Sequence, residues 1–235
     1  MLNAYITQVQ QLLNNPNATS ALYSTTNLTN FINMARGQLA GETECIRVLG
    51  SLALSSSQQV YPFSSITLSS VSGIAGVFNV RGISWAASST PTYLTPRPFP
   101  YFMAYYLNNS GISNGPPMEY SQYAQGEGGS LYFNPTPDAS YTVYPDCVCV
   151  PIALVDDTTV EAIPYPYTDA VQYFAAYLAY TSAQRSQDAA TMFQLYKLFA
   201  GRARQMSNGE VFPEQYAQSP AAIAVPTPQV PGGNG

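Results

Sequence analysis

The sequence predicts an α+β fold in which helices from both ends of the chain form a bundle and a β unit is inserted between them. Three observations lead to this prediction. Apolar residues recur at helical spacing near both ends, they alternate in the middle, and a Pro- and Gly-rich segment follows the last helix. We therefore divide the chain into N-terminal helices (1–44), an inserted antiparallel β-rich unit (45–157), a C-terminal helical hairpin (158–206) and an extended tail (207–235).

Two short helices are predicted in the N-terminal part. Apolar residues three and four apart begin at Leu2 and continue to Leu13, and Asn14-Asn15-Pro16 should end this helix. Thr25 or Thr26 is a suitable N-cap for the second helix, which should run to Gly41 with one buried apolar face. A pair of short amphipathic helices cannot bury its apolar faces alone, so we expect these helices to pack against the C-terminal pair.

The β unit is predicted to begin at Cys45, where apolar residues start to alternate with polar ones. Gly50 interrupts the first run, which suggests a β-bulge. Further predicted strands are Val60–Phe63, Ile66–Val71, Val77–Trp85, Ser130–Asn134 and Tyr141–Val150.

Two connections within the β unit are predicted to form a defined structure, one a hairpin turn and the other a short helix. Turn residues between Asn134 and Asp138 predict that the last two strands form a hairpin. A short helix is expected from Pro98 to Leu107, and its apolar side should contain Phe99, Phe102, Met103 and Tyr106.

Two helices are predicted after Pro164 and Pro166, and Thr168 or Asp169 should cap the first. The second runs from Ser186 to about Met206 and has more apolar residues than one buried face needs. The surplus residues either contact another subunit or are buried centrally within the bundle. The candidate subunit interface is Phe193, Leu195, Leu198 and Arg202. As an alternative, Arg202 and Arg204 complement the negative end of the helix dipole.

The composition is typical of an assembly subunit. Only 9% of the residues are charged, against roughly 25% in a typical soluble domain. The nineteen tyrosines suit subunit interfaces, which are depleted of charge and enriched in aromatic residues. The absence of histidine excludes catalytic triads, metal sites and pH switches that depend on histidine.

Charge and hydropathy limit the partners. The formal net charge is −5 and no Lys/Arg cluster is present, which argues against sequence-specific DNA binding. No apolar run is long enough to span a membrane, and the first residues lack the pattern of a signal peptide. We therefore expect that the protein does not associate with a membrane. We expect it to assemble in the cytoplasm. Cys45, Cys147 and Cys149 are interpreted as buried free thiols, because a metal site lacks a fourth ligand.

No catalytic, cofactor or metal site is expected, and we predict that the protein is not an enzyme. Asp156 and Asp157 are adjacent and are interpreted as a loop pair or as a solvated charge near a helix. The glycine-rich run 126–130 contains no lysine, so it is interpreted as a flexible turn rather than a phosphate loop. Trp85, Tyr93, Phe99 and Tyr101 are candidates for a carbohydrate-binding surface, although core packing also explains them.

Several segments, in their order and spacing, resemble one family. They are Leu2–Asn15, "YSTTNLTNFINMARGQLA", "GPPMEYSQY", "GGSLYFNPTPDASYTV" and "IPYPYTDAVQYFAAYLAYTSAQRSQDAATMFQLYKLFAGRAR". Together they resemble the head-to-tail adaptor (connector or neck) proteins of tailed bacteriophages. The chain departs from the usual pattern of that family in having few charged residues on its helices.

The resemblance implies a structural virion protein in the neck, between head and tail. It implies a homo-oligomeric ring, typically of twelve copies, that binds the portal protein ring above and a tail tube or nozzle protein below. DNA would pass through the ring without sequence-specific binding.

The C-terminal tail is the expected contact with the portal. Residues 207–235 contain five prolines, four glycines and no basic residue, so they cannot form a packed element alone. The portal-docking residues are predicted to be Val211, Phe212, Tyr216, Ile223 and Val225. A solvated terminus without a function is the alternative for the tail. The alternative for the whole protein is a Tyr-rich β module that binds carbohydrate, or an enzyme of unassigned reaction.

Overall fold

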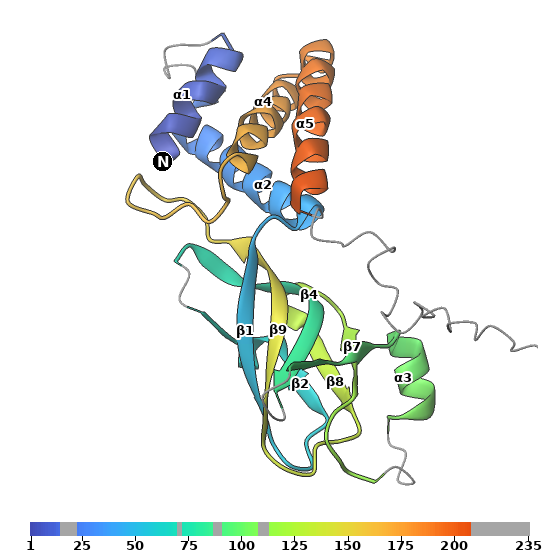
Figure 1. Cartoon of the computed structure of the whole chain (residues 1–235). Helices are drawn as coiled ribbons and strands as arrows, with labels where there is room; N and C mark the ends of the chain where they lie inside the picture. Colours follow the sequence, from blue (N-terminus) through green and yellow to red (C-terminus); the bar gives the residue numbers. More distant parts are fainter. Residues whose placement is uncertain (15–22, 70–71, 87–90, 108–112, 208–235) are drawn as a thin grey trace, which may run out of the picture.

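A computed structural model of the chain describes residues 1–14, 23–69, 72–86, 91–107 and 113–207, and it shows a mixed α+β fold. Figure 1 shows the longer helices at one end of the molecule and the strands at the other. Helices from the two ends of the sequence lie together, and the strands come from the middle of the chain.

The N-terminal helices are α1 (Leu2–Leu12) and α2 (Thr25–Thr43), and both contact the later helices. The N-cap of α2 is Ser24, whose hydroxyl accepts a hydrogen bond from the Asn27 amide, so the predicted caps were one or two residues too late. The helix also continues past Gly41 and ends at Glu44, which adopts a left-handed conformation.

The C-terminal helices are α4 (Val171–Ser182) and α5 (Ser186–Ser207). A 3-10 turn, η4 (Tyr167–Ala170), precedes α4, and no side chain caps the helix. The predicted caps at Thr168 and Asp169 were therefore wrong, because both residues lie inside this turn. Tyr180 of α4 donates a hydrogen bond of 2.9 Å to the Leu12 carbonyl, which joins α4 to the end of α1.

Two sheets make up the β unit. The five-stranded sheet is antiparallel, whereas the four-stranded sheet contains one parallel pair, β6 with β7. In spatial order the first sheet is β3 (Thr67–Leu68), β1 (Arg47–Leu54), β9 (Tyr141–Pro151), β4 (Ile74–Ala86) and β5 (Pro91–Tyr93). The second is β2 (Val60–Pro62), β8 (Ser130–Asn134), β7 (Glu119–Tyr123) and β6 (Thr95–Pro96).

The predicted hairpin between the last two strands was wrong. β8 pairs with β2 and β7, whereas β9 pairs with β1 and β4 in the other sheet. The segment after Asn134 therefore carries the chain from one sheet to the other. Turn residues indicate a change of direction, but they do not specify which strand becomes the neighbour.

The predicted bulge at Gly50 was also wrong, because β1 and β9 keep a constant register on both sides of it. Close packing explains this glycine instead, since a Cβ atom there would lie 2.6 Å from a methyl carbon of Ile66. The register shifts occur in β4, between Ile74 and Gly76, Val77 and Asn79, and Val80 and Gly82. Such shifts bend a strand and increase its twist.

A short helix, α3 (Phe99–Tyr105), covers the four-stranded sheet at the predicted position. Phe99 packs against Tyr123 and Tyr132, with ring centroids 4.5 and 5.0 Å apart, and Phe102 is fully buried. Met103 was assigned to this apolar side, but it is exposed to solvent. A helix of two turns presents only a narrow buried face, and Met103 lies outside it.

The junction between helices and strands is held by Arg36 of α2, whose side chain is 1% exposed. Its guanidinium forms an ion pair with Glu161 at 2.7 Å and donates a hydrogen bond of 2.6 Å to the Ile152 carbonyl. Asn33, one turn earlier, bonds both the amide and the carbonyl of Leu154. These contacts fix the segment that leaves β9 against α2.

We predict that Glu161→Ala lowers the free energy of unfolding by about 3–5 kcal/mol, because it leaves the Arg36 guanidinium buried without its partner charge. Chemical denaturation of the two proteins measures this difference. Asp188→Ala is the matched control, since it breaks the Arg185–Asp188 pair, whose side chains are 52% and 47% exposed. The control should change the stability by less than about 1 kcal/mol. Equal small losses for both variants would contradict a structural role for the buried pair.

Candidate subunit interface

Helix α5 carries the residues predicted for subunit contact, and small side chains hold it against the other helices. Its buried residues are Ala189, Tyr196, Ala200 and Ala203. Three alanines on one face let the helix backbone approach its neighbours closely.

Tyr196 is the large residue of this buried face. Its hydroxyl donates a hydrogen bond of 2.6 Å to the Glu42 carboxylate, which ties α5 to α2. Burial raises the pKa of the Tyr196 hydroxyl above its ordinary value, and the Glu42 charge raises it further. The hydroxyl therefore keeps its proton and remains a donor.

Phe193 is half-buried, and its ring lies against α4. Its ring lies 4.9 Å from that of Tyr177, and the Lys197 ammonium sits 4.6 Å from the Phe193 ring centre. A shallow groove of about 460 Å³ between α4 and α5 includes Tyr177, Ala190 and Phe193 in its lining. Phe193 thus contributes mainly to packing between the two helices.

Leu195, Leu198 and Arg202 lie three and seven residues apart along α5, a spacing that places them on one side of the helix. Leu198 is 51% exposed, and Leu195 is half-buried. The exposed Arg202 has its guanidinium 5.7 Å from the centre of the Phe199 ring. Three of the four predicted interface residues therefore share one outer side of α5, and Phe193 lies on the opposite flank.

The C-terminal end of α5 adds a small pocket of about 170 Å³ next to this side. Arg202 and Met206 line it from α5, and Asp169 lines it from η4. Arg204 lies in the last turn, where a cation complements the helix dipole. Ser207 closes the helix against α2 through a hydrogen bond of 2.6 Å to the Thr43 carbonyl.

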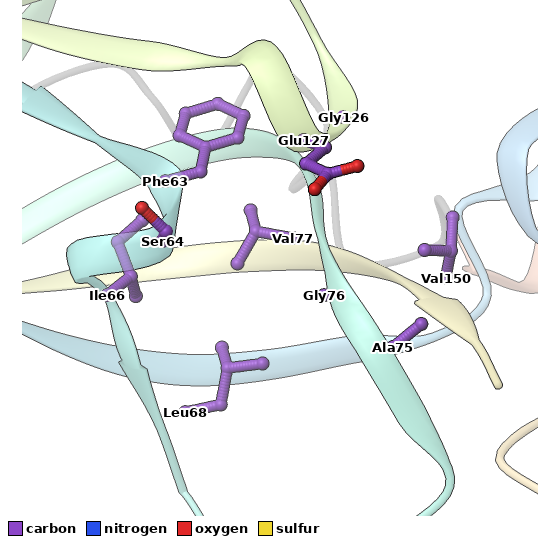
Figure 2. Close-up of a pocket in the computed structure, with 10 residues that line it drawn as sticks. All are labelled: Phe63, Ser64, Ile66, Leu68, Ala75, Gly76, Val77, Gly126, Glu127 and Val150. Carbon is purple, nitrogen blue, oxygen red and sulfur yellow. The ribbon is translucent and has the colours of Figure 1, made fainter.

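The β unit contains a larger cleft that the sequence reasoning missed. Its volume is about 630 Å³, and Figure 2 shows Ile66, Leu68 and Val77 around the space, with the Glu127 carboxylate at one end. The lining comes from β3, β4, β9 and the 3-10 turns η2 (Phe63–Ser65) and η3 (Gly126–Gly128). Periodicity within one segment cannot reveal a site that is built from so many separate segments.

The glycine-rich run 126–130 forms η3 and the start of β8. Gly126 has a φ of +66°, and a Cβ atom at Gly129 would lie 2.3 Å from the Phe63 ring. These glycines serve a tight turn packed on an aromatic ring at the edge of the cleft.

The four aromatic residues considered for carbohydrate binding come from three elements, β4, β5 and α3. Trp85 packs edge-on against Tyr141, and Phe99 packs on the four-stranded sheet. Tyr101 lies on α3, and Tyr93 on β5 is exposed. Core packing thus accounts for half of this set.

Asp156 and Asp157 both organise the loop after β9, as their predicted place in a loop near a helix suggests. Asp156 accepts hydrogen bonds from the Thr158 and Thr159 amides, whereas Asp157 accepts one of 2.8 Å from the Asn3 amide at the start of α1. The Thr158 hydroxyl also donates to Asp156, and this bond together with the amide bonds lowers the pKa of the Asp156 carboxyl, whereas the bond from the Asn3 amide lowers that of Asp157.

The three cysteines are buried free thiols, as predicted. Burial raises the pKa of Cys147 to about 12 and that of Cys149 to about 11. Among the residues that the structure describes, no cluster of His, Cys, Asp or Glu is suited to hold a metal ion. None of the helices in the described ranges is long and apolar enough to cross a membrane.

The predicted portal-docking residues, Val211, Phe212, Tyr216, Ile223 and Val225, lie outside the described residues, which end at Ser207.

The chain was compared with known proteins and protein families. No curated protein matches the chain. The family model of the SU10 adaptor protein matches residues 3–224, which is nearly the whole sequence. This match confirms the resemblance to phage head-to-tail adaptors and supports a structural role in the virion. The chain belongs to the SU10 adaptor protein family.

Proposed function

We propose that the protein is a head-to-tail adaptor that assembles into a ring, typically of twelve copies, between the portal and the tail tube or nozzle. The match of the family model over residues 3–224 is the observation that carries this proposal. In the ring, DNA leaves the head through the central channel. The protein acts by binding neighbours rather than by catalysis, in the neck of a virion assembled in the host cytoplasm.

Each of the four segments of the chain has its own role in this proposal. The helical pairs, residues 1–44 and 158–206, form the bundle that builds the ring, and residues 45–157 form the inserted β unit. The outer side of α5, with Leu195, Leu198 and Arg202, contacts the next copy. Residues 207–235 extend to the portal, where Val211, Phe212, Tyr216, Ile223 and Val225 dock.

The distribution of basic residues supports a channel that does not hold DNA. Five of the eight basic side chains form ion pairs: Arg36, Arg47, Arg81, Arg97 and Arg185. Lys197 and Arg202 lie over aromatic rings, and Arg204 lies at the negative end of α5. Basic side chains that already interact with a carboxylate, an aromatic ring or a helix end of the same subunit contribute little to phosphate binding. DNA in the channel is therefore attracted only weakly.

Leu198→Asp should prevent ring formation on the portal while leaving the melting temperature of the free subunit within a few degrees. A half-exposed leucine on the outer side of α5 contributes more to a neighbour than to its own core, and a buried unpaired carboxylate is unfavourable there. Native mass measurement of adaptor–portal complexes gives the copy number.

Ala190→Asp is the control for this variant, because Ala190 is exposed on the opposite flank of α5. It should assemble normally. A Leu198→Asp variant that forms complete rings would refute the α5 contact, and an unmutated chain that forms no ring with its portal would refute the adaptor function.

Removal of residues 208–235 should leave a folded subunit that no longer attaches to portal-bearing heads. Twenty-eight residues (235 − 207) span roughly 90 Å when extended at ~3.3 Å each, which is enough to reach well beyond the domain. Cosedimentation with heads measures attachment.

A full-length variant with Val211, Phe212 and Tyr216 replaced by Ser separates the docking residues from chain length. It should also fail to attach. Normal attachment of the truncated protein would exclude the tail as the docking element.

A further inference from the structure

The cleft of the β unit is apolar along its floor and acidic at one end. Ile66, Leu68, Val77 and Val150 supply aliphatic side chains, and Glu127 places its carboxylate at the rim (Figure 2). Glu127 is exposed, and the described residues offer it no ion pair. A complementary ligand would present apolar side chains next to a cation.

The outer face of α3 has this composition. Its inner residues Phe99 and Phe102 pack on the sheet, whereas Tyr101, Met103 and Tyr105 are exposed, Met103 to 54%. Arg97 lies beside them, with its guanidinium 5.6 Å from the Tyr101 ring centre. Exposed apolar side chains gathered on a single short helix are typical of a protein contact.

The two surfaces lie on different sides of the β unit. The cleft is bounded by β3, β4 and β9 of the five-stranded sheet and by the turns η2 and η3, whereas α3 covers the four-stranded sheet. Figure 1 shows α3 on the outer side of the molecule, away from β1 and β9. One copy therefore presents the helix and the cleft in different directions, and both are available to neighbours.

We propose that the outer face of α3 in one copy docks into the β cleft of the next copy, so that the β units form a second, head-to-tail interface. A contact between two different surfaces of identical subunits repeats around an axis, and it closes into a ring when the rotation between neighbours is a whole fraction of a turn. This inference rests on the proposed ring and identifies the part of each neighbour that meets at the level of the β unit.

The charge at the cleft rim and the volume of the cleft both support α3 of a second copy as the ligand of the cleft. Docking brings Arg97, beside Tyr101, toward Glu127 at the cleft rim. Arg97 already binds Glu119 through Nε and Nη2, and the rest of its guanidinium has N–H groups for a second carboxylate. The cleft volume of about 630 Å³ accommodates several side chains of the size of Met and Tyr.

Cross-linking between single-cysteine additions tests this contact. Met103→Cys and Ala75→Cys are made in separate preparations, since both positions are exposed and Ala75 lines the cleft. The preparations are mixed, assembled on the portal and treated with a short bis-maleimide. The native cysteines are buried, so they should not react. We expect a covalent dimer in the mixture and monomers in each preparation alone.

Gln187→Cys replaces Met103→Cys in the control mixture, because Gln187 is exposed in the first turn of α5, in the helical part. A mixture of Met103→Cys and Ala75→Cys that forms no more dimer than this control overturns the proposal. If rings form but no cross-link is found, the α3–cleft contact is refuted and the adaptor function is not. If no rings form on the portal, both the contact and the adaptor function are refuted.

Filling the cleft gives a second test. Ala75→Trp should reduce the fraction of assembled rings by about tenfold, the loss expected from one central contact, without changing the melting temperature of the subunit. Met103→Asp should have the same effect. If Met103→Asp rings assemble normally but lose a tail protein, α3 belongs to the contact with the tail and the proposal is wrong.

Discussion

The buried ion pair between Arg36 and Glu161 is the constraint on which the arrangement of the molecule depends. A guanidinium that is almost completely buried requires a partner charge and hydrogen-bond acceptors, and both come from the segment that follows β9. Because Arg36 lies on α2, satisfying it fixes where the chain leaves the β unit and turns toward α4. A second pair, Arg81 with Glu44, joins β4 to the end of α2. The inserted β unit is therefore tied to the helices by charge as well as by chain connectivity.

Close packing at two glycines, together with the register shifts of β4, determines the shape of the β unit. Gly50 admits the Ile66 side chain against β1, and Gly129 admits the Phe63 ring against the turn before β8. The register shifts of β4 let one long strand bend beside β9. As a result, β3 and the start of β4 both border the same cleft, although two strands separate them in the sheet. The shape of the cleft is thus a consequence of where small residues and bulges occur.

The helices, and most of the strands, follow from local patterns in the sequence, because apolar spacing directly reports a buried face. Strand pairing does not, which is why β8 was matched to β9: turn residues such as those after Asn134 carry no information about distant partners. Residue spacing alone places Leu195, Leu198 and Arg202 on one side of α5. The role of Phe193, in contrast, depends on its contact with Tyr177 of α4. The cleft required the whole fold, since its lining comes from five separate elements.

A rigid junction is also what a closed ring requires of each subunit. Closure depends on every copy repeating the same rotation relative to its neighbour. If the helices and the β unit turned freely about each other, the contacts proposed at α5 and at the cleft would favour different rotations, and small errors would accumulate around such a ring. Arg36, Asn33 and Glu44 hold the two parts in one relative orientation. Two of the ion pairs in this charge-poor chain thus lie at the junction, where they set the angle between the surfaces proposed for subunit contact.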